Sequence, residues 1–289
     1  MFKRIGVVGQ SKYPALADTL NTLAAFADQH GLELEVEEEL QPFLPNAKPF
    51  ALDEIDLLIT LGGDGTLLRG SRIVAETHTP VLGVNLGYMG FLTSVAPDEL
   101  SGSLTRILAG DYWLDVRFTL EACVIDAAGK CGNSYIALND AVLHKGGFAR
   151  VIRLGVFVGE KREEVGSYSA DGIILATPTG STAYSLSASG PIVVPTVDCI
   201  IATPICPHSL VLRPLVLPSN EEIRIEVQST TTELMLTVDG QDGEQVKSGS
   251  ALLVRKGKPT VPLVRFEGQS FFSTLRRKLH WGLGVQNKY

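Results

Sequence analysis

The sequence of 289 residues has few cysteines, no surplus of positive charge and no long uninterrupted hydrophobic run. Its four cysteines, Cys123, Cys131, Cys199 and Cys206, form no C-x-x-C pair, which predicts free thiols in a reducing compartment, the cytoplasm. The formal charge of −7 leaves no basic footprint for nucleic acid. The most apolar stretch, residues 192–217, contains charged residues and prolines, so we expect neither a membrane span nor a membrane partner.

Metal-binding patterns are also missing. The five histidines have no metal-ligand spacing to one another or to cysteine, so we expect no metal held by side chains alone. Glycine is the residue type in excess, with 29 of 289 residues, or about 10% against roughly 7% in an average protein. Because glycine is needed where a backbone turns tightly or closely approaches another group, its clusters mark candidate binding loops.

The first part of the chain alternates strand and helix patterns. Continuous apolar strands are predicted over residues 4–9, 55–61 and 80–85, and helices over 14–30, 67–77 and 97–109. Gly31 fits the end of the first helix. The alternation predicts an α/β domain over residues 1–112, built around a parallel sheet with helices on both faces.

From residue 113 the pattern changes to alternating strands and polar turns. Strands are predicted over 113–126, 134–143, 151–158 and 173–177, with turns at 239–240 and 256–259. These features predict a β-rich domain of packed antiparallel sheets over residues 113–268. Helical spacing returns over 270–280 with Ser270 as N-cap, so residues 269–289 are expected to form a C-terminal helix returning to the first domain.

A glycine-rich turn follows the second apolar strand, at the position where an open α/β sheet binds its ligand. Residues 62–66 read GGDGT and lead into a helix, so their N–H groups suit a phosphate. The pattern is neither a P-loop nor a G-x-G-x-x-G fingerprint. A carboxylate here repels phosphate unless Asp64 holds a metal or accepts a proton, although an ordinary Asp-Gly turn fits as well. The phosphate-cradle candidates are Gly62, Gly63, Thr66 and Arg69.

Two further polar stretches lie in the β-rich part. Asn139 and Asp140 interrupt an apolar strand predicted over 136–143, and an amide beside a carboxylate suits the hydroxyls of a ribose. An exposed strand edge or a turn is the alternative. Residues 177–187 are rich in hydroxyl side chains, and residues 179–182 can cap a helix that begins near Ala183, with hydroxyls and N–H groups facing a ligand. Hydrolase chemistry is disfavoured because no G-x-S-x-G elbow is present.

Four segments in order along the chain resemble the signature segments of the NAD kinase family: residues 62–66 (GGDGT), 85–93 (NLGYMGFLT), 138–140 (LND) and 169–187. The GGDG segment alone also resembles lipid kinases of the diacylglycerol type and, more distantly, phosphofructokinases. The full set is similar to bacterial NAD kinases. This resemblance implies phosphoryl transfer from ATP to the 2′-hydroxyl of the adenosine ribose of NAD, giving NADP, with Asp64 as the catalytic proton acceptor.

The resemblance also implies a set of contacts to NAD. Asn139 and Asp140 would hold the adenosine ribose, and Tyr184 would lie near a base or nicotinamide ring. Arg150 suits a phosphate but also fits a solvated arginine, and Gln241 also fits a plain hairpin turn. The implied NAD contacts are Asp64, Gly65, Asn139, Asp140, Arg150, Asp171, Thr182, Ala183, Tyr184, Ser185, Leu186, Ser187 and Gln241.

A divalent cation is implied as cofactor, and Mg²⁺ is the ion that suits phosphates and one or two carboxylates. The resemblance further implies a homodimer or homotetramer. Two other functions stay open, a GGDG lipid kinase and a non-catalytic nucleotide sensor. The sequence also leaves open whether the donor is ATP or polyphosphate and whether NADH is accepted.

Overall fold

The computed structural model describes residues 2–51, 54–88, 90–126, 128–146, 151–228, 234–247 and 249–282. The chain divides into two compact units: unit 1 comprises Met1–Val116 and Val261–Tyr289, and unit 2 comprises Arg117–Thr260. Arg150 lies outside the described residues. None of the helices in the described ranges combines the length and the apolar character that crossing a membrane requires.

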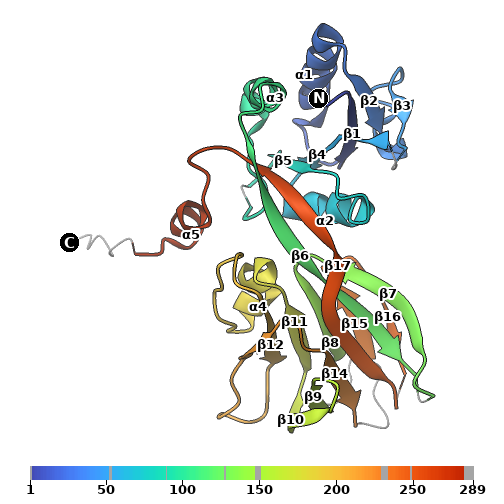
Figure 1. Ribbon diagram of the computed structural model, residues 1–289, viewed down its shortest axis with the longest axis vertical. Coiled ribbons are helices and arrows are strands. Elements are labelled where there is room, and N and C mark those ends of the chain that lie inside the picture. The colour runs from blue at the N-terminus through green and yellow to red at the C-terminus, as the bar shows by residue number, and fades with distance from the viewer. Residues whose placement is uncertain are drawn as a thin grey trace. The chain divides into compact units, whose positions relative to one another are not determined.

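Unit 1 is built on a parallel sheet, as the alternating pattern predicts. Its strands lie side by side in the order β5 (Val81–Asn85), β4 (Leu57–Gly62), β1 (Arg4–Gly9), β2 (Glu33–Val36) and β3 (Lys48–Pro49), as Figure 1 shows. All of these pairings are parallel. After β1 the chain adds β2 and β3 on one side of it, and β4 and β5 then follow on the other side. The strand order therefore reverses between β1 and β4, and their carboxyl ends form a topological switch point.

The helices in the described part of unit 1 are short, and all but the 3-10 turn at Pro97–Glu99 bury apolar residues. They are α1 (Leu16–His30), η1 (Glu38–Leu40), α2 (Asp64–Ile73), η3 (Pro97–Glu99), α3 (Leu100–Leu108) and α5 (Phe271–Leu279). Leu20 and Leu23 of α1 pack with Val7 and Ile59 of the sheet. Gly31 ends α1 in the left-handed conformation, and Ser270 Oγ caps α5 by accepting from the Ser273 N–H, both as predicted.

Unit 2 consists of two antiparallel sheets. One contains β6 (Trp113–Ile125), β7 (Cys131–Ala137), β9 (Ile152–Val158), β10 (Glu163–Ala170), β14 (Ile223–Val227) and β17 (Ala251–Arg265). The other contains β8 (Asp140–Lys145), β11 (Gly172–Ala176), β12 (Cys199–Ile205), β13 (Leu215–Pro218), β15 (Leu234–Val238) and β16 (Asp242–Val246). The first residues of β6 and the last of β17 belong to unit 1.

A hydrophobic core lies between the two sheets of unit 2. In β11, Ile173 and Leu175 belong to this core, whereas Ile174 and Ala176 belong to a second cluster on the opposite face. Val193, in the segment after β11, packs against the second cluster. This segment also contains η4 (Thr179–Thr182) and α4 (Tyr184–Ser187). Strand β11 is therefore buried on both faces, which explains its uninterrupted apolar sequence.

Several predicted boundaries were wrong. The single strand expected over 134–143 is two strands in different sheets, β7 and β8, with Leu138 and Asn139 between them. The turn expected at 256–259 lies inside β17, where Thr119 Oγ1 of β6 donates to the Pro259 carbonyl at 2.7 Å. Helix α2 begins at Asp64 and ends at Ile73, so the aspartate is in the first helical turn and not in the loop.

The expectation of free cysteines was also wrong for one pair. Cys123 of β6 and Cys131 of β7 form a disulfide, with their Cα atoms 5.9 Å apart. The two strands are antiparallel neighbours, and this Cα distance lies within the range that a disulfide spans. Cys199 is free and buried, and Cys206 is free and exposed.

Candidate functional site

The GGDG segment lies at the switch point of unit 1. Gly62 ends β4, Gly63 is the N-cap of α2, and Asp64 is the first residue of that helix. The N–H groups of Thr66 and Leu67 donate to the Gly63 carbonyl at 3.0 and 3.2 Å, so the turn passes directly into the helix. A negative charge at a helix N-terminus is favoured by the helix dipole, and the Asp64 carboxylate occupies that position.

The Asp64 carboxylate is held by the second glycine-rich segment. Its Oδ2 accepts the Phe91 N–H at 2.7 Å, and its Oδ1 accepts the Leu92 and Thr93 N–H groups at 3.1 Å each. The Thr93 hydroxyl donates to Oδ1 at 3.4 Å. At Gly90 a Cβ atom would overlap the carboxylate, so this position requires glycine. The two glycine-rich segments thus form one structure organised around Asp64.

Arg69 lies at the same edge of the sheet with its charge already paired. Its Nη2 donates to Glu37 Oε1 at 2.9 Å and to the Gly9 carbonyl at 2.8 Å, and Nη1 also donates to Glu37. Glu37 Oε1 accepts the Gly9 N–H at 2.6 Å. The arginine and the glutamate therefore fix the carboxyl end of β1 beside the GGDG turn. Thr66 Oγ1 is buried without a hydrogen-bond partner among the described residues.

A cavity of about 340 Å³ in unit 2 brings together several of the predicted site residues. Asn139 and Asp140 line it at the start of β8, and Ala183 and Tyr184 line it at the start of α4. Tyr184 is 46% exposed, and an exposed aromatic side chain can stack on a ligand ring. The remaining lining residues are Val142, His144, Thr237, Asp239 and Gly240.

Asp239 holds the break between β7 and β8, and the sequence had indicated only a hairpin turn there. Its Oδ1 accepts the N–H groups of Asn139 and Asp140 at 2.8 and 3.1 Å, and its Oδ2 accepts that of Leu138 at 3.0 Å. These three hydrogen bonds fix the orientation of the backbone between β7 and β8. With the backbone held in this way, Asn139 and Asp140 line the cavity.

The second fixed contact of this break is made by Gly180. A Cβ atom at Gly180 would overlap the Asn139 carbonyl, so only glycine allows η4 to approach so closely. Thr177 contacts the break from the same side, since its N–H donates to the Asn139 carbonyl at 2.8 Å and its hydroxyl to the Leu138 carbonyl at 2.6 Å. The hydroxyl-rich segment therefore supports the cavity wall through its backbone and its buried hydroxyls.

Burial changes the acidity of Asp140, which is only 4% exposed. Desolvation, followed by the negative charge of Asp239, raises its pKa from 3.8 to about 7. The Asp239 carboxylate accepts three backbone N–H groups, and no such contact is seen for the Asp140 carboxylate among the described residues. Asp140 is therefore a carboxylate of the cavity whose charge changes near neutral pH.

The other residues predicted to bind NAD do not line this cavity. Asp171 Oδ1 is ion-paired with Lys145 Nζ at 2.7 Å, and Gln241 is exposed in the turn between β15 and β16. The Ser185 hydroxyl is fully buried and bonded to that of Thr203, so it faces the interior. The Thr182 hydroxyl points back to the Thr179 carbonyl at 3.4 Å. Gly65 lies in the first turn of α2, Leu186 is half-buried, and Ser187 is exposed.

Glu37 and Asp239 support the site, but local sequence does not indicate these roles. Glu37 belongs to an acidic stretch that reads as a solvated surface, and only the fold places it against Gly9 and Arg69. Asp239 carried one usable signal, because an Asp-Gly pair permits left-handed backbone, and Asp239 has a φ of 49°.

Comparisons with known proteins agree on one family. Residues 6–112 match the model of the ATP-NAD kinase N-terminal domain, and residues 138–266 match that of the C-terminal domain. An NAD kinase of Gemmatimonas aurantiaca is 48% identical over 96% of this chain and 96% of its own length. An NAD kinase of Moorella thermoacetica is 40% identical over 97% of this chain and 90% of its own length.

Solved structures give the same result for the fold. A yeast NADH kinase, crystallised with NADH, aligns with a TM-score of 0.90 and 26% identity, over 100% of this chain and 90% of that one. An NAD kinase of Archaeoglobus fulgidus in complex with ATP aligns with a TM-score of 0.74 and 24% identity, over 96% and 98% of the two chains.

Proposed function

The chain belongs to the ATP-NAD kinase family, and from this premise we propose that it transfers the terminal phosphoryl group of ATP to the 2′-hydroxyl of the adenosine ribose of NAD. The observation that carries the proposal is the pair of glycine-rich segments organised around the Asp64 carboxylate at the switch point of unit 1. This is where an open α/β sheet binds nucleotides.

In this proposal Asp64 accepts the proton of the attacking hydroxyl. A phosphoryl-transfer transition state is loose, so most of the catalysis comes from positioning and from neutralising charge, with a correctly aimed base. The N–H groups of Phe91, Leu92 and Thr93 hold the carboxylate in one orientation. Helix α2 begins at Asp64 within the GGDG turn, and the N-terminus of a helix favours a bound phosphate. Arg69 acts here by fixing Gly9, because Glu37 already pairs with its charge.

The cavity of unit 2 takes the adenosine ribose in the same proposal. The ionised Asp140 carboxylate accepts hydrogen bonds from ribose hydroxyls, and the Asn139 amide can both donate and accept. Tyr184 offers a ring face for a base. The proposal also includes further contacts to NAD. They come from Arg150, Asp171, Thr182, Leu186, Ser187 and Gln241.

A divalent cation belongs to the proposal as part of the nucleotide substrate. Among the described residues, no three His, Cys, Asp or Glu side chains are grouped so as to hold a metal ion. Magnesium is usually held by substrate phosphates with few protein ligands, so we propose that it enters with ATP and is not held by a side-chain cage.

The decisive experiment is an assay of purified protein for NADP formation with NAD, ATP and Mg²⁺. Parallel reactions replace NAD with NADH or diacylglycerol, and ATP with polyphosphate. Formation of NADP supports the proposal and identifies the donor and acceptor. Binding of NAD without turnover would favour a nucleotide sensor, and turnover of diacylglycerol alone would favour a lipid kinase. Location in the cytoplasm belongs to the same proposal.

The raised pKa of Asp140 predicts a pH dependence for NAD. Below pH 7 the carboxyl is protonated and accepts ribose hydroxyls poorly, so kcat/KM for NAD should rise with pH through about 7. The same burial should lower the stability of the folded chain as the pH rises from 3.8 through 7, because the folded state holds this proton more tightly than the unfolded state. Asp140→Asn should remove both dependences, whereas the exposed control Asp198→Asn should keep them.

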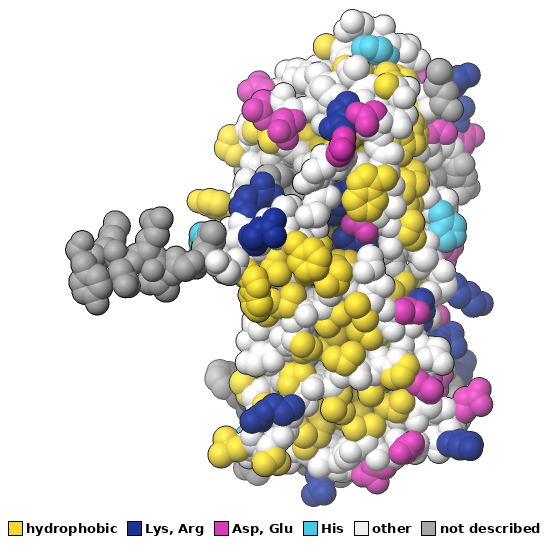
Figure 2. Space-filling view, turned by 60° about the vertical axis from the view of Figure 1, so that its left-hand side comes forward, with side chains coloured by type: hydrophobic (Ala, Val, Ile, Leu, Met, Phe, Trp, Pro, Cys, Tyr) yellow, Lys and Arg dark blue, Asp and Glu magenta, His cyan; other side chains and the backbone are white. Residues whose placement is uncertain are grey.

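An assembly of two or four chains is also proposed, with the contact on unit 2. Hydrophobic side chains are visible at the surface of the protein (Figure 2). In unit 2, Leu210 and Val211 are 92% and 85% exposed, and Leu215 and Val216 of β13 are also exposed. Apolar side chains exposed together are typical of a protein contact. Sedimentation of the purified chain at several concentrations measures the number of copies.

A further inference from the structure

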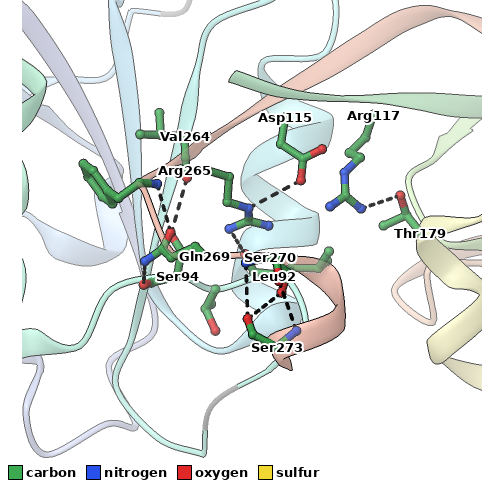
Figure 3. Close-up of polar contacts among 12 residues, drawn as sticks. Leu92, Ser94, Asp115, Arg117, Thr179, Val264, Arg265, Gln269, Ser270 and Ser273 are labelled. Carbon is green, nitrogen blue, oxygen red and sulfur yellow. Dashed lines mark hydrogen bonds and ion pairs between the residues drawn. The ribbon is translucent and has the colours of Figure 1, made fainter. Parts of the chain in front are cut away.

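The segment that holds Asp64 is itself held by a residue far along the chain. Arg265, the last residue of β17, is 7% exposed, and its Nη1 donates to the Leu92 carbonyl at 2.8 Å. Its Nε lies 3.5 Å from Asp115 Oδ2. Figure 3 shows the Arg265 guanidinium with contacts to both Asp115 and Leu92. All of these residues belong to unit 1.

One peptide group connects this arginine to Asp64. The Leu92 carbonyl and the Thr93 N–H are two ends of the same peptide, and the N–H donates to Asp64 Oδ1 at 3.1 Å. The carbonyl end accepts from a cation, which polarises the peptide and makes its N–H a stronger donor. Both hydrogen bonds lie in a largely buried region, where low local polarity strengthens them further.

We propose that Arg265 is a positioning residue for Asp64, and that it acts through the peptide group between Leu92 and Thr93. The inference rests on the proposed role of Asp64 as proton acceptor. Arg265 fixes the direction and the strength of a hydrogen bond to Oδ1, and so fixes the orientation of the carboxylate toward the hydroxyl it deprotonates. Asp115 balances the charge of the buried guanidinium.

A neighbouring contact provides a matched control. Gln269 Nε2 donates to the Ser94 carbonyl at 2.7 Å, so it ties the same segment to the same returning part of the chain (Figure 3). The peptide that contains the Ser94 carbonyl has its N–H on Val95, and this N–H donates to the Gly83 carbonyl at 3.2 Å. The Gln269 contact therefore anchors the segment without leading to Asp64.

The first test compares Arg265→Met, Arg265→Lys and Gln269→Leu in the full-length enzyme. We expect Arg265→Met to lower kcat about tenfold or more, with little change in KM for NAD, because a hydrogen bond that orients the base acts on the transition state. Arg265→Lys keeps a cationic donor and should recover part of kcat. Gln269→Leu should lower the melting temperature but keep kcat near the wild-type value. Equal kcat losses in Arg265→Met and Gln269→Leu, or wild-type kcat in Arg265→Met, would overturn the proposal.

The second test does not depend on activity. A strongly polarised N–H resonates downfield, so the Thr93 amide proton should shift upfield in Arg265→Met and stay near its wild-type position in Gln269→Leu. If loss of the ion pair with Asp115 prevents Arg265→Met from folding, the double variant Arg265→Met with Asp115→Asn removes both charges and serves instead. If the Thr93 amide shift in Arg265→Met equals that of the wild type, Arg265 does not act on Asp64 through this peptide group, and the proposal is refuted. An inactive wild-type enzyme refutes the proposed function, and the Thr93 shift still decides the connection.

Discussion

Replacing Asp64 with asparagine is expected to lower kcat by about 10²-fold or more, the usual scale for loss of a general base, while NAD binding changes little. The amide has almost the same shape, and its oxygen can still accept from the N–H groups of Leu92 and Thr93. It cannot accept a proton from a hydroxyl. Its NH₂ group would also face the Phe91 N–H, so part of the hold on the carboxylate is lost as well.

The measurement is steady-state kinetics of NADP formation, with calorimetry of NAD binding to the variant. Asp111→Asn is the control, because Asp111 is a carboxylate of unit 1 that pairs with Arg106 at the surface. That variant should keep wild-type kcat. Wild-type turnover in Asp64→Asn would show that Asp64 is a structural clamp of the second glycine-rich segment and not a base.

Replacing Asp239 with alanine is expected to destabilise unit 2 by about 3 kcal/mol, since each buried donor left without a partner costs roughly 1–3 kcal/mol. The three N–H groups of Leu138, Asn139 and Asp140 lose their acceptor together. The peptides that place Asn139 and Asp140 at the cavity are then free to turn, so KM for NAD should rise sharply. Chemical denaturation and kinetics measure the two effects.

Asp239→Asn separates the two roles of this carboxylate. Asparagine tolerates the left-handed backbone at position 239 and keeps one acceptor oxygen, so most of the stability should remain. It removes the charge that helps to raise the pKa of Asp140, so the pH dependence of NAD use should move to lower pH. If the alanine variant is as stable as the wild type, the proposed role of Asp239 is wrong.

Local periodicity predicted the parts of the fold that depend on local sequence. The strand Arg4–Gly9 and the helix that ends at Gly31 were recovered because their apolar spacing is read within a few residues. Strand β10 was not predicted, since it is largely exposed and contains an irregularity between Glu164 and Gly166. The strand β17 continues through Gly257 and Pro259, which locally resemble a turn, because β6 pairs with it.

The candidate site depends on contacts that no local pattern contains. The GGDG turn and its carboxylate were identified from sequence, since glycine and helix-start signals lie together there. The break at Leu138 and Asn139 was read as a continuous strand, because the carboxylate that fixes it lies about a hundred residues away at Asp239. The resemblance implied that Ser185 lies at the ligand site, and the fold places its hydroxyl in a buried hydrogen bond with Thr203, a contact that no local pattern contains.

Unit 1 consists of two segments that unit 2 separates in the sequence, so its two parts are synthesised at different times. Unit 2 is continuous in sequence and can complete its two sheets during translation, whereas unit 1 needs residues from both ends of the chain. Strand β5 pairs with β17 only after Leu263 has been synthesised. The Leu92 carbonyl likewise gains its hydrogen bond only when Arg265 is present. An incomplete chain released before these residues would present the GGDG turn without its full support. Residues of unit 1 that follow unit 2 in the sequence thus determine when the candidate base acquires its final environment.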